Sequence, residues 1–329
     1  MDSGAMALNL SPWLAPRAGG RAALAVGTMN FGGRTSPAEA GRIVACALER
    51  GLPFFDTASS YGDGEAERVL GQALRGRREA VGIATKAGLA RVRGKPEGLS
   101  PEALTSAVDA SLQRLGTDFV DLLYLHQSDP HTPLEQTLDA LGRLLQAGKV
   151  RGWGVSNHAA WQLLELQGLA KSAGLPPPAA SQVLYNLLVR QLDVEYLPFT
   201  RRHPVHTAVY NPLAGGLLSG RYAPGAAIAQ GSRFAGNRFY QRRYWSERLL
   251  AQAARLAALA QTEGLGLLEL AYAWLAQREG VDSILAGPGS VAHLEAALAA
   301  LQRPLSPALL ARVDDAHRDF LGTDASYAR

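Results

Sequence analysis

Four residues whose side chains can exchange protons stand at or just after the ends of three short apolar runs. Asp56 ends the first run, and Tyr61 stands five residues further on. Lys86 ends the second run, and His126 ends the third. A tyrosine hydroxyl is a poor acid near neutral pH, since its reference pKa is about 10, so a proton-donating tyrosine needs a cation beside it. We expect Lys86 to be that cation if the three runs are neighbouring strands.

Short apolar runs alternate with helical patterns along nearly the whole chain, in eight strand-then-helix units. The predicted strands begin at Ala23 (extending to Phe31), Phe54, Val81, Asp118, Val150, Ala180, Val205 and Asp282. The predicted helices cover about 36–51, 65–74, 100–115, 133–147, 159–173, 194–199, 247–262, 267–278 and 290–301, and a last amphipathic helix covers about 307–320. A polar, Arg-rich and aromatic loop is expected over about 219–245.

Strands that alternate with helices favour parallel pairing with both faces of the sheet covered. Eight units fit a closed (β/α)8 barrel, or TIM barrel, better than an open sheet, in which about six strands are usual. No linker-like or low-complexity segment divides the chain, so we expect a single α/β domain over residues 1–329. Residues 1–22 would form an N-terminal extension, and residues 302–329 an extra C-terminal helix and tail.

In such a barrel, successive strand ends lie side by side on the face that carries catalysis. We therefore expect the four proton-exchanging residues to meet there. Taken alone, each of these residues could have an ordinary structural role, such as a loop cap or a buried core histidine. Four of them in this order at three strand ends favour a functional site. Further polar groups follow later strands, namely Ser156, Asn157, Gln182, Asn186, Tyr210 and the turn 287–290.

These later strand ends predict a nucleotide cofactor that lies across the barrel mouth. Their amide and hydroxyl groups suit a planar ligand with its own amide, and Tyr210 could stack on such a ring. Glycine-rich turns after the seventh and eighth strands, leading into a helix N-terminus, form the usual phosphate site of this architecture. Arg221 and Arg233 lie in the adjoining loop and can pair with phosphate.

Other nucleotide signatures and a metal signature are missing. Gly-x-Gly occurs at 62–64, 152–154, 264–266 and 287–289, but none continues to a third glycine three residues on. No Gly-x-x-x-x-Gly-Lys-Ser/Thr occurs either, so a Rossmann domain and a P-loop are disfavoured. His203 and His206 flank the start of a strand, at the end of the barrel away from the site, so no catalytic metal is expected.

The composition is that of an ordinary globular chain, with 47% hydrophobic and 19% charged residues and a net charge of +4. The mild basic excess is not clustered, so a nucleic-acid partner is not expected. No stretch reaches the roughly 18 apolar residues of a membrane span, and Asp2 without a basic start disfavours a secretory signal, so the cytoplasm is the expected location. The single cysteine, Cys46, excludes an internal disulfide and is expected to be buried and inert.

From about Ala23 to Leu301 the motifs resemble those of aldo-keto reductases. The matching stretches are Gly-Thr-Met at 27–29, Phe-Asp-Thr-Ala-Ser-Ser-Tyr-Gly at 55–62, Ala-Thr-Lys at 84–86, Asp-Leu-Leu-Tyr-Leu-His at 121–126, Gly-Val-Ser-Asn at 154–157, Gln-Val-Leu-Tyr-Asn at 182–186 and Tyr-Asn-Pro-Leu-Ala-Gly-Gly at 210–216. The resemblance implies a barrel enzyme that moves hydride between a nicotinamide cofactor, usually NADPH, and a carbonyl group.

The resemblance also implies roles for single residues. Tyr61 would be the general acid in carbonyl reduction, and Lys86, paired with Asp56, would lower the pKa of Tyr61. His126 would orient the carbonyl oxygen beside Tyr61. Ser156, Asn157 and Gln182 would hold the carboxamide of the cofactor, and Tyr210 would stack on its nicotinamide ring. The full set expected to bind cofactor is Gly27, Thr28, Met29, Asp56, Ser156, Asn157, Gln182, Tyr210, Asn211, Pro212, Leu213, Gly215, Gly216, Leu217, Arg221, Arg233, Gly287, Gly289, Ser290 and His293.

The chain departs from the resembled pattern after the eighth strand. There the pattern has a small residue and then Ser or Arg, with Gln, Glu and Asn along the next helix, whereas this chain has Pro288, Gly289, His293, Ala296 and Ala297. The glycine and the alanines cannot bond an adenine or a 2′-phosphate through their side chains, so both NADP and NAD stay open as cofactors. Ser290, His293, Arg221 and Arg233 are the candidates to compensate. A milder departure is Asn211, which stands where serine is common.

The substrate class and two other functions stay open. A carbonyl compound with an apolar or aromatic body is the default substrate, and the candidates to line its pocket are Phe31, Trp153, Phe234, Phe239, Tyr240 and Trp245. One alternative is a cofactor-binding regulatory or redox-sensing subunit with little turnover, like the potassium-channel β subunits that resemble the same family. Another is a barrel lyase or isomerase that uses Lys86 as a Schiff base. The oligomeric state has no signature in the sequence.

Overall fold

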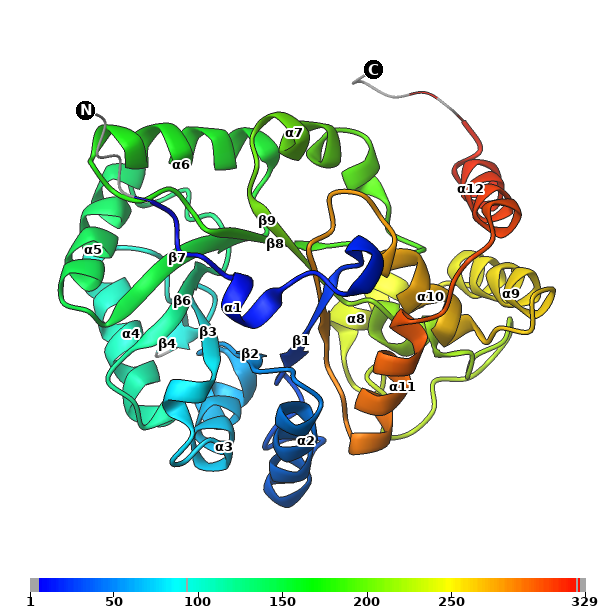
Figure 1. Cartoon of the computed structure of the whole chain (residues 1–329), viewed down its shortest axis with the longest axis horizontal. Helices are drawn as coiled ribbons and strands as arrows, with labels where there is room; N and C mark the ends of the chain where they lie inside the picture. Colours follow the sequence, from blue (N-terminus) through cyan, green and yellow to red (C-terminus); the bar gives the residue numbers. More distant parts are fainter. Residues whose placement is uncertain (1–5, 93, 324, 326–329) are drawn as a thin grey trace.

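The computed structural model describes residues 6–92, 94–323 and 325, and its centre is a closed barrel of parallel strands. In barrel order the strands are β1 (Ala23–Gly27), β10 (Ser283–Ala286), β9 (His206–Tyr210), β8 (Ala180–Leu184), β7 (Val150–Ser156), β6 (Val120–Leu125), β3 (Gly82–Ala87) and β2 (Phe54–Asp56). Strand β1 pairs in parallel with both β10 and β2, which closes the sheet on itself. The predicted (β/α)8 fold is confirmed (Figure 1).

Helices follow the strands and surround the barrel (Figure 1). They are α2 (Pro37–Glu49), α3 (Glu65–Ala73), α4 (Pro101–Leu115), α5 (Leu134–Gln146), α6 (Ala160–Ser172), α7 (Tyr196–Arg202), α10 (Leu267–Ala276) and α11 (Val291–Leu301). Ser36 and Ser100 cap α2 and α4 as predicted, because each side chain accepts from a backbone N–H three residues on and each is followed by proline. Gly116 ends α4 with a left-handed φ of 66°.

The barrel wall itself sets which side chains reach the mouth. The interior is filled largely by small residues and a few rings, including Ala23, Ala25, Phe54, Ala84, Tyr124, Ala180 and Ala208. Because side chains alternate between the two faces of a strand, the residue two positions beyond this layer also faces inward, at the C-terminal end of the strand. The residues at those positions are Asp56, Lys86, His126, Gln182 and Tyr210.

Part of the segment before β1, for which the sequence predicted no period, closes the opposite end of the barrel. It contains the short helix α1 (Ser11–Leu14), which lies in front of the strands in Figure 1. Leu10 and Leu14 are buried in the interior cluster. A Cβ on Gly82 would stand 2.8 Å from the ring of Trp13, so the tight packing of this segment requires glycine there.

Three other segments differ from the prediction. Strand β1 ends at Gly27 and not at Phe31. A hairpin of β4 (Arg91–Val92) and β5 (Lys95–Pro96) follows β3. The predicted loop 219–245 contains the helix α8 (Arg238–Tyr244), because the Asn237 side chain caps it and two of its tyrosines are buried against the core. Capping by asparagine and burial of one face are enough to hold so short a helix.

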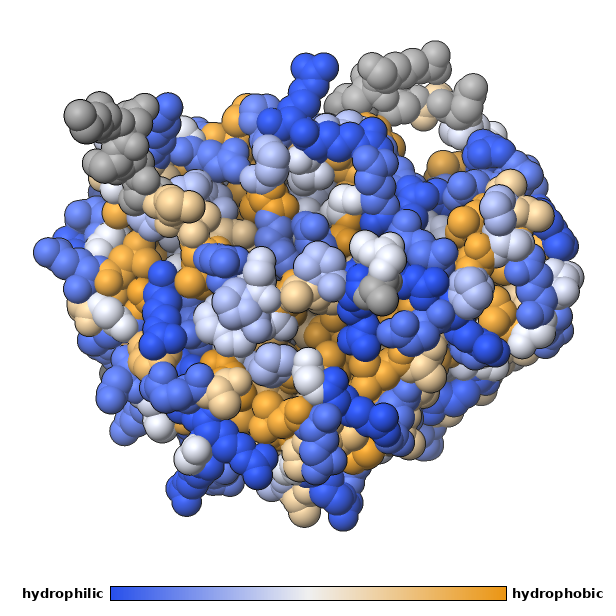
Figure 2. All heavy atoms as spheres, in the orientation of Figure 1, coloured by the Kyte–Doolittle hydropathy of each residue, from blue (hydrophilic) through white to orange (hydrophobic). Residues whose placement is uncertain are grey.

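The predicted extra C-terminal helix is present as α12 (Pro307–Leu321). It packs beside α9 (Glu247–Gln261), where the amide of Gln252 donates to the carbonyl of Ala316 over 3.0 Å. The face shown in Figure 2 mixes hydrophilic residues with separate hydrophobic patches. In the part of the chain that the structure describes, no helix is long and apolar enough to cross a membrane.

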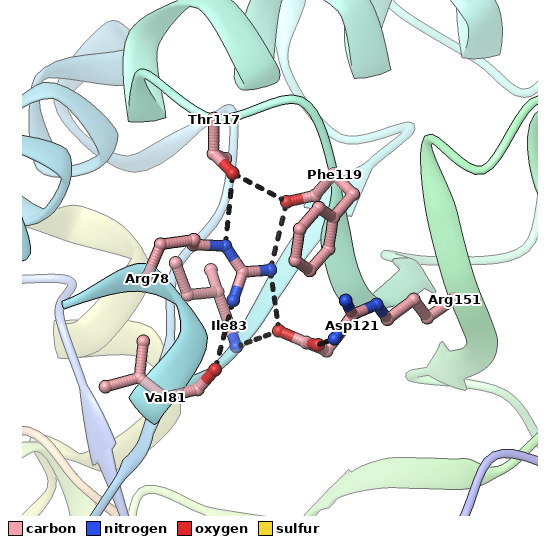
Figure 3. Close-up of polar contacts among 7 residues, drawn as sticks. All are labelled: Arg78, Val81, Ile83, Thr117, Phe119, Asp121 and Arg151. Carbon is pink, nitrogen blue, oxygen red and sulfur yellow. Dashed lines mark hydrogen bonds and ion pairs between the residues drawn. The ribbon is translucent and has the colours of Figure 1, made fainter. Parts of the chain in front are cut away.

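A buried carboxylate ties three strands together at their N-terminal ends (Figure 3). The side chain of Asp121 is fully buried and accepts from Arg78 (2.7 Å), from Arg151 (3.0 Å) and from the backbone N–H of Ile83 (2.9 Å). Both guanidinium groups also lie over the ring of Phe119, 3.9 and 3.7 Å from its centre. The cluster lies at the N-terminal ends of the strands, the end of a (β/α)8 barrel that serves stability, so we infer a structural role for it.

We expect Asp121→Asn to lower the free energy of unfolding by about 2 kcal/mol, because it leaves two guanidinium groups facing a neutral amide. Chemical denaturation measures this change. The matched control is Asp109→Asn, which removes an exposed ion pair to Lys149 and should change stability by less than about 0.5 kcal/mol. Equal stability of the two variants would contradict the role given to Asp121.

Candidate active site

Lys86 is the centre of a buried polar cluster at the barrel mouth. Its ammonium donates to the carboxylate of Asp56, to the backbone carbonyl of Thr57 (2.9 Å) and to the hydroxyl of Tyr61 (3.2 Å). The second carboxylate oxygen of Asp56 accepts from the amide of Gln182 (2.8 Å). All three ammonium donors are therefore used. Because the hydroxyl oxygen of Tyr61 accepts from Lys86, its own proton stays free to be donated to another group.

The loop after β2 that carries Tyr61 has an uncommon backbone. Tyr61 begins a short 3-10 helix, Tyr61–Gly64, whose last three residues have left-handed φ values of 56°, 53° and 86°. Glycine adopts this region freely, whereas Asp63 is the one non-glycine of the three. A Cβ on Gly64 would stand 2.5 Å from the side chain of Arg114, so this position also has no room for a larger residue.

Arg114 belongs to a brace behind the loop that the sequence reasoning did not identify. Its guanidinium pairs with the fully buried carboxylate of Glu67 over 2.6 Å. The other oxygen of Glu67 accepts from the hydroxyl of Thr85, the residue before Lys86. The brace therefore connects the segment that follows Tyr61 with the strand that carries Lys86. The only signal in the sequence is an acidic residue on the apolar face of a helix.

Burial governs the ionisation of the cluster. Burial raises the pKa of Tyr61 above its usual range; the Lys86 ammonium opposes this rise and the Asp56 carboxylate adds to it. Burial lowers the pKa of Lys86, but Asp56 and Tyr61 outweigh it and leave the pKa raised. Lys86 therefore acts on the pKa of Tyr61 in the predicted direction, but burial outweighs it and the net shift is upward. Tyr61 is a neutral phenol beside a charged ammonium, the state in which it carries a proton.

His126 lies beside Tyr61 in an edge-to-face arrangement, with 6.1 Å between ring centres. Burial, and next the charge of Lys86, lowers the pKa of His126 to about 3. The imidazole is therefore neutral at physiological pH and can form hydrogen bonds but has no extra proton to give. Its Nδ1 is buried and has no hydrogen-bond partner within the described residues. Tyr61 is thus left as the proton donor of the pair.

Asn157 connects three strand ends at the mouth. Its amide nitrogen donates to the backbone carbonyl of His126 (2.9 Å) and to the hydroxyl of Ser156 (3.1 Å). Its amide oxygen accepts from the hydroxyl of Tyr210 (2.6 Å). These bonds hold Asn157 at a left-handed φ of 58°, which asparagine tolerates better than most residues. Gln182, predicted to bind a carboxamide together with Ser156 and Asn157, donates its side-chain N–H to Asp56.

The loop after β9 is shaped by backbone strain and close packing. Asn211 and Ala214 have left-handed φ values of 56° and 48°, and the amide nitrogen of Asn211 is buried without a partner in the described chain. Gly215 is also left-handed, and a Cβ there would stand 2.8 Å from the ring of Tyr240. Leu217 has its side chain fully buried in the core, so only its backbone can face a ligand.

The turn after β10 uses most of its predicted ligand groups locally. The hydroxyl of Ser290 caps α11 by accepting from the backbone N–H of His293 (3.3 Å). Nδ1 of His293 accepts from the backbone N–H of Gly289 (3.3 Å). Arg221, in the preceding loop, donates to the hydroxyl of Ser219 (3.2 Å). A Cβ on Gly27 would stand 3.2 Å from the carbonyl oxygen of Ala286, where the ends of β1 and β10 meet.

Arg233 lies at the same junction, together with two residues that the sequence reasoning missed. Arg233 donates to the side-chain oxygen of Asn30 (2.7 Å), and so does Arg34 (2.7 Å). The amide nitrogen of Asn30 donates to the carbonyl of Gly287 (3.0 Å). Asn30 and Arg34 stand four residues apart just after Gly27-Thr28-Met29, a spacing without a pattern of its own.

The mouth fits a polar, planar ligand. Buried polar atoms nearly always have partners, so the orphaned Nδ1 of His126 and Nδ2 of Asn211 indicate groups that await a hydrogen-bonding ligand. The glycines around the β1–β10 junction allow close approach of a bulky group. Within the described ranges, no group of three or more His, Cys, Asp or Glu residues could hold a metal ion.

Most aromatic candidates for the substrate pocket belong to the core instead. Phe31, Trp153 and Phe234 are fully buried, and the indole of Trp153 donates to the carbonyl of Pro176 on the outer side of the barrel wall. Phe239 is the exception, with 60% of its surface exposed. Cys46, predicted to be buried, is half-buried and packs against the core.

Comparison with known proteins gives consistent results. A sequence model of the aldo/keto reductase family matches residues 23–318. The chain is 36% identical over 314 residues to aflatoxin B1 aldehyde reductase member 2 of Mus musculus, covering 90% of this chain and 84% of that protein. It is 35% identical over 308 residues to aldo-keto reductase family 7 member A3 of Homo sapiens, with 88% and 92% covered.

A further relative carries a different name. The chain is 34% identical over 280 residues to a probable voltage-gated potassium channel subunit beta of Arabidopsis thaliana, with 82% of this chain and 85% of that protein covered. Both kinds of relative match across most of the barrel, and the family match begins at β1 and runs into α12. This chain belongs to the aldo/keto reductase family.

Proposed function

We propose that this protein is an NADPH-dependent reductase of aldehydes and ketones in which Tyr61 donates the proton. The observation that carries the proposal is the hydrogen bond from Lys86 to the hydroxyl of Tyr61, in a cluster buried at the barrel mouth. Family membership and the aflatoxin aldehyde reductase relatives support an oxidoreductase that acts on carbonyl groups. We also propose that residues 1–329 fold as a single domain.

When bound, a nicotinamide cofactor supplies the hydride; the protein supplies position and the proton. Tyr61 would donate its hydroxyl proton to the carbonyl oxygen of the substrate. The ammonium of Lys86 would stabilise the phenolate left behind, and Asp56 would keep Lys86 charged. Neutral His126 would hold the carbonyl oxygen by a hydrogen bond. Oxidation of the alcohol would use the same groups in reverse.

The cofactor would lie across the mouth from the β7 end to the β10 turn. Ser156 and Asn157 would contact its carboxamide, and Tyr210 would pack on its ring. The remaining predicted contacts are Gly27, Thr28, Met29, Asp56, Gln182, Asn211, Pro212, Leu213, Gly215, Gly216, Leu217, Arg221, Arg233, Gly287, Gly289, Ser290 and His293. NADP is the proposed cofactor, and NAD stays possible because Ser290 and His293 bond locally.

A regulatory subunit with little turnover is the second candidate, and the relative named as a potassium channel subunit beta favours it. A Schiff-base enzyme is not supported, because the raised pKa of Lys86 and its bond to Asp56 keep the amine charged and unreactive. The two remaining candidates share a cofactor site and differ in turnover.

A single titration separates these candidates. We expect purified protein to bind NADPH, seen as quenched protein fluorescence, and to oxidise it when a panel of aromatic and aliphatic aldehydes is added. The loss of absorbance at the nicotinamide band measures turnover. Binding without oxidation of NADPH by any aldehyde would favour the regulatory subunit. No binding of either NADPH or NADH would overturn the proposed function and leave the family fold alone.

A further inference from the structure

The hydrogen bond between Lys86 and Tyr61 joins two separate elements of the barrel mouth. Lys86 is part of β3, whereas Tyr61 stands in the loop after β2, and 3.2 Å separates the ammonium from the hydroxyl oxygen. This distance is at the long end of the range for an N–H···O bond, and a further separation of about 0.4 Å ends the bond. The position of the loop relative to β3 therefore decides whether Lys86 can act on Tyr61.

The backbone of this loop leaves β3 before it reaches Tyr61. Within the described chain, the last backbone bond from the loop to β3 runs from the N–H of Ser59 to the carbonyl of Lys86 (3.1 Å). Tyr61 itself donates its backbone N–H to Ala58 (3.1 Å), inside the loop. The turn that follows includes Asp63 at a left-handed φ of 53°, a conformation that persists only where the surroundings enforce it. The turn needs support from outside.

Glu67, in the first turn of α3, contacts both elements from the outer side of the barrel wall. One of its carboxylate oxygens accepts from the hydroxyl of Thr85 (2.5 Å), the residue before Lys86. The Thr85 side chain reaches outward because side chains alternate along β3 and Lys86 faces inward. The other oxygen of Glu67 accepts from Nε of Arg114 (2.6 Å). The side chain of Glu67 is fully buried, so neither oxygen has water as an alternative partner.

Arg114 carries the support from Glu67 to the turn. Its side chain lies directly against the backbone of Gly64, where a Cβ would stand 2.5 Å away. The guanidinium also donates to the hydroxyl of Ser111 (3.1 Å), which fixes it to α4. Gly64 is three residues beyond Tyr61, at the end of the same 3-10 turn. A movement of Arg114 therefore moves the turn that holds Tyr61.

We propose that Glu67 is a positioning residue for proton transfer, which fixes Tyr61 against Lys86 through Arg114 on one side and Thr85 on the other. The proposal rests on the proposed function, in which Tyr61 donates the proton. Glu67 lies behind the wall and acts only through these two neighbours. Donation of the proton leaves a phenolate that Lys86 stabilises, so a longer distance slows the chemical step more than it weakens binding.

The test removes one contact at a time from the full-length protein. Thr85→Val deletes the hydroxyl and keeps the shape and the strand preference, whereas Thr85→Ser keeps the hydroxyl. Glu67→Gln keeps the shape and removes the charge that holds Arg114. The control is Asp121→Asn, which also removes a buried carboxylate paired with arginine, but at the opposite end of the barrel. All assays are run well below the thermal midpoint of each variant.

We expect Thr85→Val and Glu67→Gln to lower kcat for aldehyde reduction about tenfold, a part of the roughly hundredfold that 1 Å of misplacement costs. Here kcat is expressed per NADPH site, counted by fluorescence titration, so that unfolded protein does not contribute. KM and the affinity for NADPH should stay as in wild type. Thr85→Ser should restore most of kcat, and Asp121→Asn should keep all of it.

A second readout needs neither cofactor nor turnover. Without cofactor, the backbone amides of residues 59–66 should exchange hydrogen faster in Thr85→Val and Glu67→Gln than in wild type or Asp121→Asn, because the turn has lost its support. Mass spectrometry of the peptides that cover this segment measures the exchange.

Three results would overturn the inference. They are a wild-type kcat per site in both Thr85→Val and Glu67→Gln, a loss in Thr85→Ser as large as in Thr85→Val, and an equal loss in Asp121→Asn. Failure of the proposed function gives a different result, since wild type itself would then not oxidise NADPH with any aldehyde. In that case unchanged exchange of residues 59–66 would still refute the link.

Discussion

Replacing Tyr61 with phenylalanine is expected to lower kcat for carbonyl reduction by about 10²- to 10⁴-fold, the range that a positioned general acid contributes. The ring and its contact with His126 remain, so only the proton and the acceptor for Lys86 are lost. Because neutral His126 has no extra proton to give, it cannot take over the role of the acid. Steady-state oxidation of NADPH by a reactive aldehyde measures the change.

The same variant should keep its affinity for NADPH within about threefold, since Tyr61 is not among the proposed cofactor contacts. Fluorescence titration of Tyr61→Phe supplies this control. The matched control is Tyr222→Phe, a half-buried tyrosine that packs against Phe234 and Trp245 away from Lys86. Undiminished reduction by Tyr61→Phe would remove Tyr61 from the mechanism and point to a solvent proton.

Replacing Lys86 with methionine is expected to cost about 3–5 kcal/mol of stability, because it leaves the Asp56 carboxylate buried without its cation. Within the described part of the chain, only the amide of Gln182 would still bond to that carboxylate. Turnover should fall at least as far as in Tyr61→Phe. Urea denaturation gives the stability, and assays well below the midpoint give the turnover.

A second substitution separates the structural from the catalytic role of Lys86. In the double variant Asp56→Asn with Lys86→Met the uncompensated charge is gone, so we expect most of the lost stability to return. Turnover should stay as low as in Lys86→Met alone. A double variant that regains activity together with stability would show that Lys86 acts only through the fold. A Lys86→Met protein as stable as wild type would contradict the buried pair.

The alternation of strands and helices could be predicted from the sequence, because the apolar periodicities of strands and of helices are local. Apolar runs of a few residues, capped helices such as that after Ser36, and eight repeats were enough to predict a closed barrel. The positions of Asp56, Lys86 and His126 at strand ends follow from the same pattern, since every second residue of a strand faces the interior. Their catalytic roles stay predictions.

The short helices in the segments predicted as loops have no such periodicity. Residues 10–14 plug the barrel and residues 238–244 form α8, yet neither segment has enough periodic residues to stand out from a loop. Helices of four and seven residues owe their stability to tertiary packing. The surface against which such a segment packs cannot be predicted from the few residues of the segment itself.

The sequence by itself determined the barrel and the family, and it placed Asp56, Lys86 and His126 at the ends of strands. Only the tertiary structure decided their electrostatics. The direction of the pKa shift of Tyr61 depends on how completely the packed chain excludes water, and that outweighs the adjacent ammonium. The cation pair on Asn30 likewise joins residues 203 positions apart, Asn30 and Arg233. Burial and contacts between distant loops leave no local period in a sequence, so they emerge only when the barrel closes.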